Sequence, residues 1–384
     1  MKDSSFFLIP IVTIILLLLF FMFYLLCTIA RQQQVKSLQK QLEKQNILQE
    51  DFADYNDTLG DEKLDEEQEG HVESLHTKTI KTPKNIYVLT NVEQIYDKFF
   101  SKVYKKMISS FKVPLMEHES DRFYKKVRTF FPPRDKDYSL QFCDLGCGPG
   151  SHGMYMVRNY ANIHFTGFDI SSNMLDILST SYQKLRDNEE TNEDTTKEPK
   201  NKISIRGRLR ATQGTFFDKE ALTEKKFHGL SMFYFSFYYA SHNLTTLLNN
   251  VHTWGLPGCI FMIHLVDPER FDAMLDAANL FVGFSLNKYK EGTSEKNVSR
   301  VVFKDFEYTS RYDYNKERKV ATFTETIDLK KKQTVRKHVH ELSMMSVDET
   351  IEQILKSQKF KLLKKESLIN VGYADQYLVY FQAA

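Results

Sequence analysis

The feature that most constrains this chain is a glycine-rich segment at residues 142–153, which reads F-C-D-L-G-C-G-P-G-S-H-G. It follows a short apolar run, residues 140–144, typical of a buried strand, and Ser151 after it opens a predicted helix. Because glycine has no Cβ atom, backbone in such a turn can approach a ligand closely. The spacing D-x-G-x-G-x-G, with Asp144 at the strand's end, differs from the G-x-G-x-x-G fingerprint of dinucleotide sites. The segment predicts an α/β fold with a small-molecule site.

A second acid follows a second predicted strand. Residues 165–169 read F-T-G-F-D, and Asp169 comes 25 residues after Asp144. An acid at the tip of the second strand is well placed to accept hydrogen bonds from two ribose hydroxyls.

Together these motifs resemble the class I (Rossmann-like) S-adenosylmethionine-dependent methyltransferases. The resemblance implies that Asp144 and the loop hold the amino-acid end of the cofactor, and that Asp169 holds the ribose. The loop residues it implies are Gly146, Cys147, Gly148 and Gly150. The segment I-S-S-N-M-L at 170–175 matches the family's turn into the second helix and adds Ile170 and Met174 to the implied cofactor site.

The resemblance also covers the ends of the third and fourth predicted strands. The family often has G-D-A after the third strand, where this chain has G-T-F, so Thr215 replaces the acid that meets the adenine and Phe216 can pack on the ring. The fourth strand exits into M-F-Y-F-S-F-Y-Y at 232–239, which places Phe235 among the implied cofactor contacts. An N-P-P-Y-like motif is absent there, which argues against a base amino group as acceptor. The aromatic residues fit a cage for a cationic or amphipathic acceptor, and ordinary core packing explains them equally well.

The chemistry implied needs few catalytic residues. Methyl transfer from a sulfonium is an in-line displacement, so positioning the reactants supplies most of the effect, and a base is needed only if the acceptor must lose a proton. The sequence has no G-x-S-x-G elbow or H-E-x-x-H pair. The candidate catalytic residues are His264, near the end of the predicted fifth strand, and Tyr234.

Alternating strand and helix patterns predict a Rossmann-like, seven-stranded, mostly parallel sheet flanked by helices. The turn L-P-G at 256–258 resembles the one before the family's fifth strand. Beyond the strands already named, the segments expected to form the sheet are 203–212, 230–234, 259–265, 320–329 and 374–381. The expected helices are 91–111, 172–186 and 347–358.

The N-terminus predicts a membrane anchor. Residues 6–30 carry no charge and are dominated by Leu, Ile and Phe, and about 20 apolar residues span a bilayer. A cleaved signal peptide is the alternative, but its apolar region is usually shorter. Lys2 precedes the span and four Lys/Arg follow it within 14 residues, so the C-terminal side is expected to be cytoplasmic. We therefore expect a single-pass membrane protein with its catalytic domain in the cytoplasm.

The domains expected are a transmembrane anchor at 1–30, a spacer at 31–85 and a methyltransferase domain at 86–384. The spacer is polar and acidic, with nine Lys/Arg against thirteen Asp/Glu over residues 1–85, and we expect it to be part helical and part disordered. Residues 187–200 form an acidic insertion that we expect to be a mobile loop.

Composition excludes some classes. The net charge of +2 gives no nucleic-acid footprint, and no nucleic-acid partner is expected. The four cysteines do not have metal-ligand spacing, so no metal is expected, and they indicate a reducing compartment.

The function expected is therefore a membrane-anchored S-adenosylmethionine-dependent methyltransferase acting on a small-molecule or lipid-like acceptor at the cytoplasmic face. The alternatives are a non-catalytic anchored scaffold that keeps the fold and a protein methyltransferase. The chain departs from the family pattern at Thr215 and at Cys259, where a second glycine is usual, so the non-catalytic scaffold remains an alternative.

Overall fold

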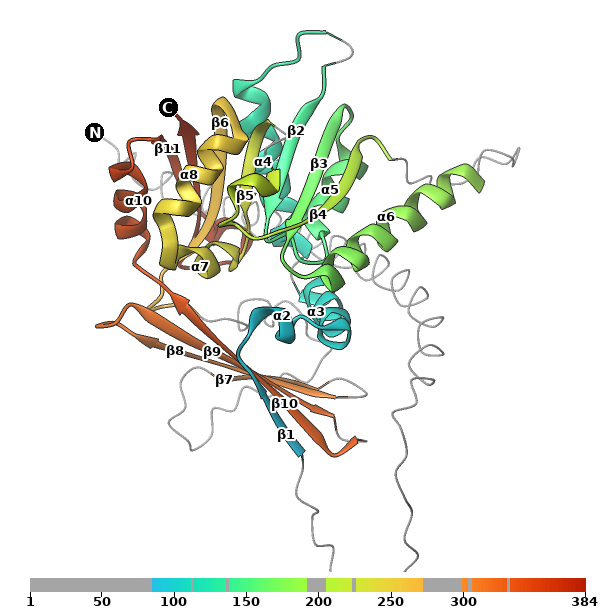
Figure 1. Cartoon of the computed structure of the whole chain (residues 1–384), viewed down its shortest axis with the longest axis vertical. Helices are drawn as coiled ribbons and strands as arrows, with labels where there is room; N and C mark the ends of the chain where they lie inside the picture. Colours follow the sequence, from blue (N-terminus) through green and yellow to red (C-terminus); the bar gives the residue numbers. More distant parts are fainter. Residues whose placement is uncertain are drawn as a thin grey trace, which may run out of the picture. The chain divides into compact units, whose positions relative to one another are not determined.

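The computed structural model describes residues 85–111, 113–135, 138–191, 205–222, 226–271, 298–302, 306–329 and 332–384 (Figure 1). These residues belong to one compact unit, Lys81–Ala384. The predicted membrane span at 6–30 and all but the last residue of the predicted spacer lie outside the described ranges. Within those ranges, no helix has the length and apolar character needed to cross a bilayer.

The main body of the unit is a seven-stranded sheet with the order β11-β12-β6-β5-β2-β3-β4. The pairs β11–β12 and β12–β6 are antiparallel and the other four pairs are parallel, so the predicted mostly parallel sheet is confirmed. The strands are β2 (Leu140–Leu145), β3 (Ile163–Asp169), β4 (Arg208–Gln213), β5 (Phe227–Met232), β6 (Gly255–Val266), β11 (Phe360–Ser367) and β12 (Gln376–Ala383). The parallel strands β2 and β3 therefore end at the same edge, where a ligand site of this architecture is expected.

Helices cover both faces of this sheet (Figure 1). Alternate residues of β2 show the division, since Phe142 belongs to the core cluster that includes residues of α4, α5 and α6, whereas Cys143 belongs to the cluster that includes residues of α8 and α10. The helices are α4 (Val113–Phe130), α5 (Ser151–Asn159), α6 (Ser172–Thr191), α7 (Ser236–Ala240), α8 (Leu244–Trp254) and α10 (Val347–Lys356). Helix α6 continues five residues beyond its predicted end into the acidic segment, and residues 192–200 of that segment lie outside the described ranges.

The predicted turn before the fifth strand is a distortion inside β6. Gly258 has φ +75°, and the pairing of β5 with β6 shifts register between Phe227 and Gly229. The strand therefore begins at Gly255, four residues before its predicted start.

A second sheet of five strands was not predicted. Its order is β1-β10-β9-β8-β7, with β1 parallel to β10 and the other pairs antiparallel. The strands are β1 (Asn85–Leu89), β7 (Val298–Val302), β8 (Glu307–Asn315), β9 (Val320–Leu329) and β10 (Thr334–Ser343).

The assignment of residues 320–329 to the main sheet was wrong. They form β9 in the centre of the five-stranded sheet, and the strand that completes the main sheet is β11, a charged edge strand. Alternation of polar and apolar residues identifies a strand with one buried face, but it does not identify the sheet that the strand joins.

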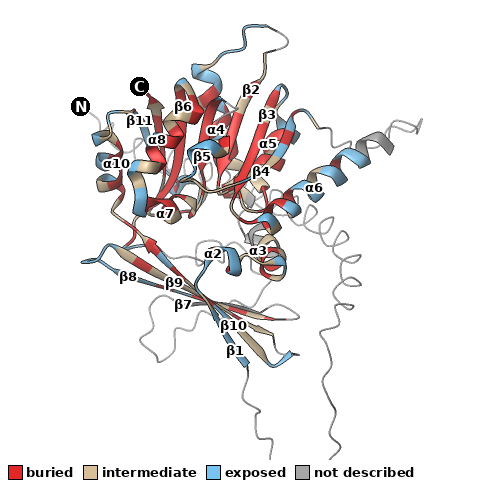
Figure 2. Ribbon diagram, in the orientation of Figure 1, coloured by how far each residue is buried: buried red, intermediate tan, exposed pale blue. Residues whose placement is uncertain are grey.

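One face of the five-stranded sheet is buried (Figure 2). Buried and more exposed residues alternate along β8, β9 and β10, so the buried side chains share a face. On that face Glu325 lies opposite His338, and Phe323 lies opposite His340. Strand β10 contacts α7, which begins just after β5 in the main sheet.

The predicted helix at 91–111 is two helices, α2 (Val92–Ile95) and α3 (Lys98–Phe111). Asp97 begins the second, because its Oδ1 accepts the backbone N–H of Phe100 at 2.8 Å. The break leaves the carbonyl of Tyr96 free to accept Ser171 Oγ at 2.9 Å and Asn173 Nδ2 at 3.3 Å. The N-terminal helices are thus joined to the turn that follows β3.

Candidate active site

The glycine loop between β2 and α5 needs glycine for geometric reasons. Gly146, Gly148 and Gly150 have φ of +77°, +54° and +76°, a region that other residues rarely adopt. A Cβ at Gly146 would lie 2.7 Å from Ser236 Oγ, and one at Gly150 would lie 2.2 Å from Leu178 Cδ1. A Cβ at Gly148 would instead have Tyr104 Cε1, at 3.8 Å, as its nearest neighbour. Gly148 therefore has room beside it, and the two outer glycines are closely packed.

Asp169 holds this loop in place. Its Oδ2 accepts the backbone N–H of Gly148 at 2.8 Å, and its Oδ1 accepts that of Ser171 at 2.9 Å. Burial raises the pKa of Asp169, although these hydrogen bonds act in the opposite direction. Each carboxylate oxygen has more than one acceptor site, so Asp169 can bind the loop and still accept a ligand hydroxyl. Its predicted role with ribose stays a prediction.

Asp144 lies at the end of β2 and is fully buried. Its Oδ1 accepts Ser231 Oγ at 2.9 Å, and burial raises its pKa to about 7. In the described part of the chain, neither Lys nor Arg forms a salt bridge with it. A buried carboxyl with no Lys or Arg salt bridge suits a ligand that carries a positive charge.

Three other predicted cofactor residues lie in the glycine loop or at the start of α6. Cys147 is buried, with a thiol pKa raised by burial, so it is a small packed residue of the loop rather than a reactive thiol. Ile170 and Met174 flank the cap of α6, where Ser171 Oγ accepts the backbone N–H of Met174.

Phe216 lies beside the loop, and the ring of Phe235 packs on Phe271 and on the second sheet. The Phe216 ring tip is 3.3 Å from the position of a Cβ on Gly146, and Thr215 precedes it after β4. Phe235 packs on Phe271, with ring centroids 5.0 Å apart, and on Phe323 of the five-stranded sheet at 6.1 Å. The structure thus brings Phe216 to the predicted cofactor loop and directs Phe235 toward the second sheet.

His264 has a partner on each ring nitrogen. Nδ1 lies 2.6 Å from Glu119 Oε1, Nε2 lies 3.1 Å from Gln376 Oε1, and the side chain is fully buried. Burial disfavours the charged Glu119, but hydrogen bonds from His152 and His264 outweigh it and lower its pKa to about 2. The predicted role of His264 as a base would require one of these bonds to break, so its geometry favours positioning. Glu119 was not predicted as a site residue, because it lies on α4 far in sequence from any motif.

Tyr234 follows β5 with φ +51°, a conformation that costs a bulky residue free energy. Its ring centroid lies 4.7 Å from that of Phe235 and 6.2 Å from that of His264. Such strained residues concentrate at functional sites, so this geometry is consistent with the prediction that Tyr234 belongs to the site.

A second polar cluster, also missed, faces the same edge of the main sheet. Glu325 Oε2 lies 3.0 Å from His340 Nε2, and His340 Nδ1 lies 2.9 Å from the hydroxyl of Tyr239. The hydroxyl of Tyr308 donates to Glu325 Oε1. Tyr239 belonged to the aromatic segment noted in the sequence, but Glu325 on β9 and the H-V-H of residues 338–340 on β10 form no recognisable sequence motif.

No family model matches the chain, and no curated protein matches it. Among solved structures, it is similar to a S-adenosylmethionine-dependent methyltransferase from Clostridium acetobutylicum, with 13% identity, a TM-score of 0.50, and coverage of 74% of this chain and 98% of that one. The methyltransferase CcbJ from Streptomyces caelestis matches at 10% identity and a TM-score of 0.48, over 71% and 90% of the two chains. The similarity to the Clostridium protein shows that the chain has the fold of class I S-adenosylmethionine-dependent methyltransferases.

Proposed function

We propose that this chain is a S-adenosylmethionine-dependent methyltransferase whose acceptor is a small or lipid-like molecule. The observation that carries the proposal is the bond from Gly148 N to Asp169 Oδ2, which joins the glycine loop to the acid of the next strand. This bond fixes both implied cofactor-binding elements at the edge where β2 and β3 end.

The residues present fit the cofactor. The buried Asp144, with no Lys or Arg salt bridge among the described residues, suits the ammonium of the methionine moiety. Gly148 leaves room beside the loop, Asp169 would hold the ribose, and Phe216 would pack on the adenine. When bound, S-adenosylmethionine supplies a methyl group already activated by its sulfonium.

The chain's own contribution is then positioning and exclusion of water. The loop and Asp169 would hold the donor's position, and Tyr104 on α3 lies beside the open position at Gly148. No covalent nucleophile is needed for an in-line displacement, because orientation supplies most of the rate.

Titration of the full chain with S-adenosylmethionine by calorimetry tests this proposal. Gly148→Val should abolish binding, because the branched side chain would fill the space beside the loop. Gly372→Val is the matched control, because Gly372 also has positive φ, +92°, and a Cβ there would meet no atom within 4 Å. If the folded wild type binds no cofactor, the chain is instead a scaffold that retains the fold, which the departure at Thr215 would explain.

The membrane anchor is a second part of the proposal. The uncharged segment 6–30 and the four Lys/Arg that follow it support a single span with the domain in the cytoplasm. Protease added to sealed vesicles should digest the domain only when it has access to the cytoplasmic face. Glycans on the sequons at Asn56, Asn243 or Asn297 would overturn this orientation.

A further inference from the structure

A line of hydrogen bonds leads from a buried acid to the hydroxyl of a partly buried tyrosine. Glu325 on β9 is bonded to His340 on β10, and His340 is bonded to Tyr239 on α7, at 3.0 and 2.9 Å. Glu325 and His340 are buried, whereas Tyr239 is partly exposed. We call these three residues the relay. An acid that orients an imidazole, which in turn contacts a hydroxyl, is the arrangement by which enzymes move a proton.

The charges around the relay favour a cation. Burial disfavours the charged form of Glu325, but the imidazoles of His338 and His340 and the Tyr308 hydroxyl outweigh it and lower its pKa to about 2. The carboxylate is thus ionised, and no Lys or Arg within the described ranges forms a salt bridge with it. His338, fully buried with its Nδ1 3.7 Å from Glu325 Oε2, has no hydrogen-bond partner on either nitrogen among the described residues.

Aromatic rings surround the outer end of the relay. The Tyr239 hydroxyl lies 3.4 Å from that of Tyr96, and the Tyr96 ring packs edge-on against Tyr104, with centroids 5.7 Å apart. Phe323 lies on the other side of His340, at 5.8 Å. Aromatic faces beside a buried carboxylate attract an organic cation.

The relay adjoins the predicted cofactor site. Tyr104 is the nearest neighbour of the open position at Gly148, and the carbonyl of Tyr96 binds the turn after β3 through Ser171 and Asn173. Tyr239 itself follows β5, so it lies at the edge where β2 and β3 end. A group bound against Tyr239 would therefore be close to the donor.

We propose that the methyl acceptor is an amine, that it enters as an ammonium ion beside Glu325, and that the relay removes its proton. This inference rests on the proposed function. The ammonium gives one proton to the Tyr239 oxygen, and the Tyr239 proton passes to His340 Nδ1. The nitrogen lone pair then forms the N–CH₃ bond, and the electrons of the broken C–S bond stay on sulfur. The proton on His340 returns to solvent after the product leaves.

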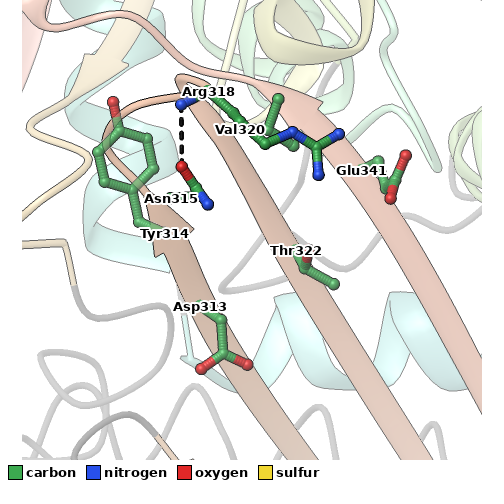
Figure 3. Close-up of a pocket in the computed structure, with 7 residues that line it drawn as sticks. All are labelled: Asp313, Tyr314, Asn315, Arg318, Val320, Thr322 and Glu341. Carbon is green, nitrogen blue, oxygen red and sulfur yellow. Dashed lines mark hydrogen bonds between the residues drawn. The ribbon is translucent and has the colours of Figure 1, made fainter.

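A depression on the opposite face of the same sheet does not serve this role (Figure 3). It is lined by Asp313, Tyr314, Asn315, Arg318, Val320, Thr322 and Glu341. Glu341 and Thr322 pair across β10 and β9 and alternate with His340 and Phe323, so they face away from the relay. Glu341 is therefore a matched control for Glu325 on the same sheet.

Two probes that differ only in their polar group test the inference. The full chain, saturated with S-adenosylhomocysteine, is titrated with benzylamine and with benzyl alcohol at pH 7. We expect the amine, which is protonated there, to bind at least tenfold more tightly, and Glu325→Gln to abolish this preference while Glu341→Gln retains it. Equal binding of the two probes overturns the amine assignment.

Transfer of a labelled methyl group tests the catalytic part. Tyr239→Phe should lower transfer to benzylamine about 100-fold or more, the usual contribution of a positioned base, and should leave cofactor affinity within about twofold of wild type. Tyr314→Phe removes a hydroxyl bonded to Met344 O at 2.9 Å, outside the relay, and should leave the rate unchanged.

The outcomes separate the two proposals. Absence of cofactor binding by the folded wild type overturns the methyltransferase function itself. Cofactor binding with preferential binding of the amine, but with no label transfer or with transfer unaffected by Tyr239→Phe, overturns the relay alone.

Discussion

Each of the two sheets contains a buried carboxyl, and the pKa values of these two carboxyls are shifted in opposite directions. Asp144 of the seven-stranded sheet has a hydroxyl partner and a pKa raised to about 7, whereas Glu325 of the five-stranded sheet has imidazole and hydroxyl partners and a pKa lowered to about 2. Asp144 has the Ser231 hydroxyl as its hydrogen-bond partner, whereas Glu325 is kept ionised by hydrogen bonds from imidazole and hydroxyl groups and forms no salt bridge with a described Lys or Arg. The difference indicates that the main sheet would bind the cofactor through backbone groups of the glycine loop and the buried carboxyl of Asp144. The second sheet would act through the hydrogen-bonded side chains around Glu325.

Removing the acid of the second sheet should have the largest effect. Glu325→Ala leaves His340 and Tyr308 without their buried partner and should lower the free energy of unfolding by about 3–5 kcal/mol. Glu341→Ala, on the exposed face of the same sheet, should change it by less than about 0.5 kcal/mol. Urea denaturation measures both. A loss of unfolding free energy as small as that of Glu341→Ala would show that the hydrogen bonds of Glu325 do not stabilise the fold.

The glycine loop should be nearly as sensitive. Gly150→Ala combines a positive φ with a contact at 2.2 Å from Leu178 and should cost about 3 kcal/mol of stability. Gly372→Ala carries only the cost of positive φ, about 1 kcal/mol, because a Cβ there would meet no atom within 4 Å. Thermal or urea unfolding compares them, and equal losses would mean that Leu178 moves aside without cost.

The contrast between the two acids also predicts a pH dependence. A carboxyl whose pKa is raised on folding stabilises the fold at low pH, and this stability is lost as pH rises through the folded value. For Asp144 the ligand-free chain should lose roughly 2–3 kcal/mol between pH 5 and 8 from this group. Asp144→Asn, which keeps an acceptor for Ser231, should reduce that slope, and the exposed Asp176→Asn should not. Identical slopes in all three proteins would contradict the uncompensated state of Asp144.

The smallest of these effects concerns the ligand rather than the fold. Asp169→Asn should weaken S-adenosylmethionine binding about 10- to 150-fold, because charge-assisted hydrogen bonds contribute roughly 1.5–3 kcal/mol. Asp176→Asn, the same change on the exposed side of α6, should leave affinity unaltered. Calorimetry measures both, and unchanged affinity in a folded Asp169→Asn protein would show that the acid only anchors the loop.

The sequence alone was enough to predict the part of the protein that would bind the cofactor. The D-x-G-x-G-x-G loop and the acid 25 residues later are local in sequence, and parallel strands bring their ends together whatever the rest of the chain does. The apolar runs of β2, β3, β5 and β6 were recognisable because strands buried on both faces are continuously apolar.

The polar clusters and the five-stranded sheet could be assigned only from the tertiary structure. The relay joins Tyr239, Glu325 and His340 over up to 101 residues of sequence, and Glu119 reaches His264 over 145. The five-stranded sheet contains β1 from residues 85–89 and β7–β10 from residues 298–343, and it is built from alternating strands that could join either sheet. Which face of such a strand is buried follows from its period of two, but the partner it faces depends on packing between segments far apart in the chain.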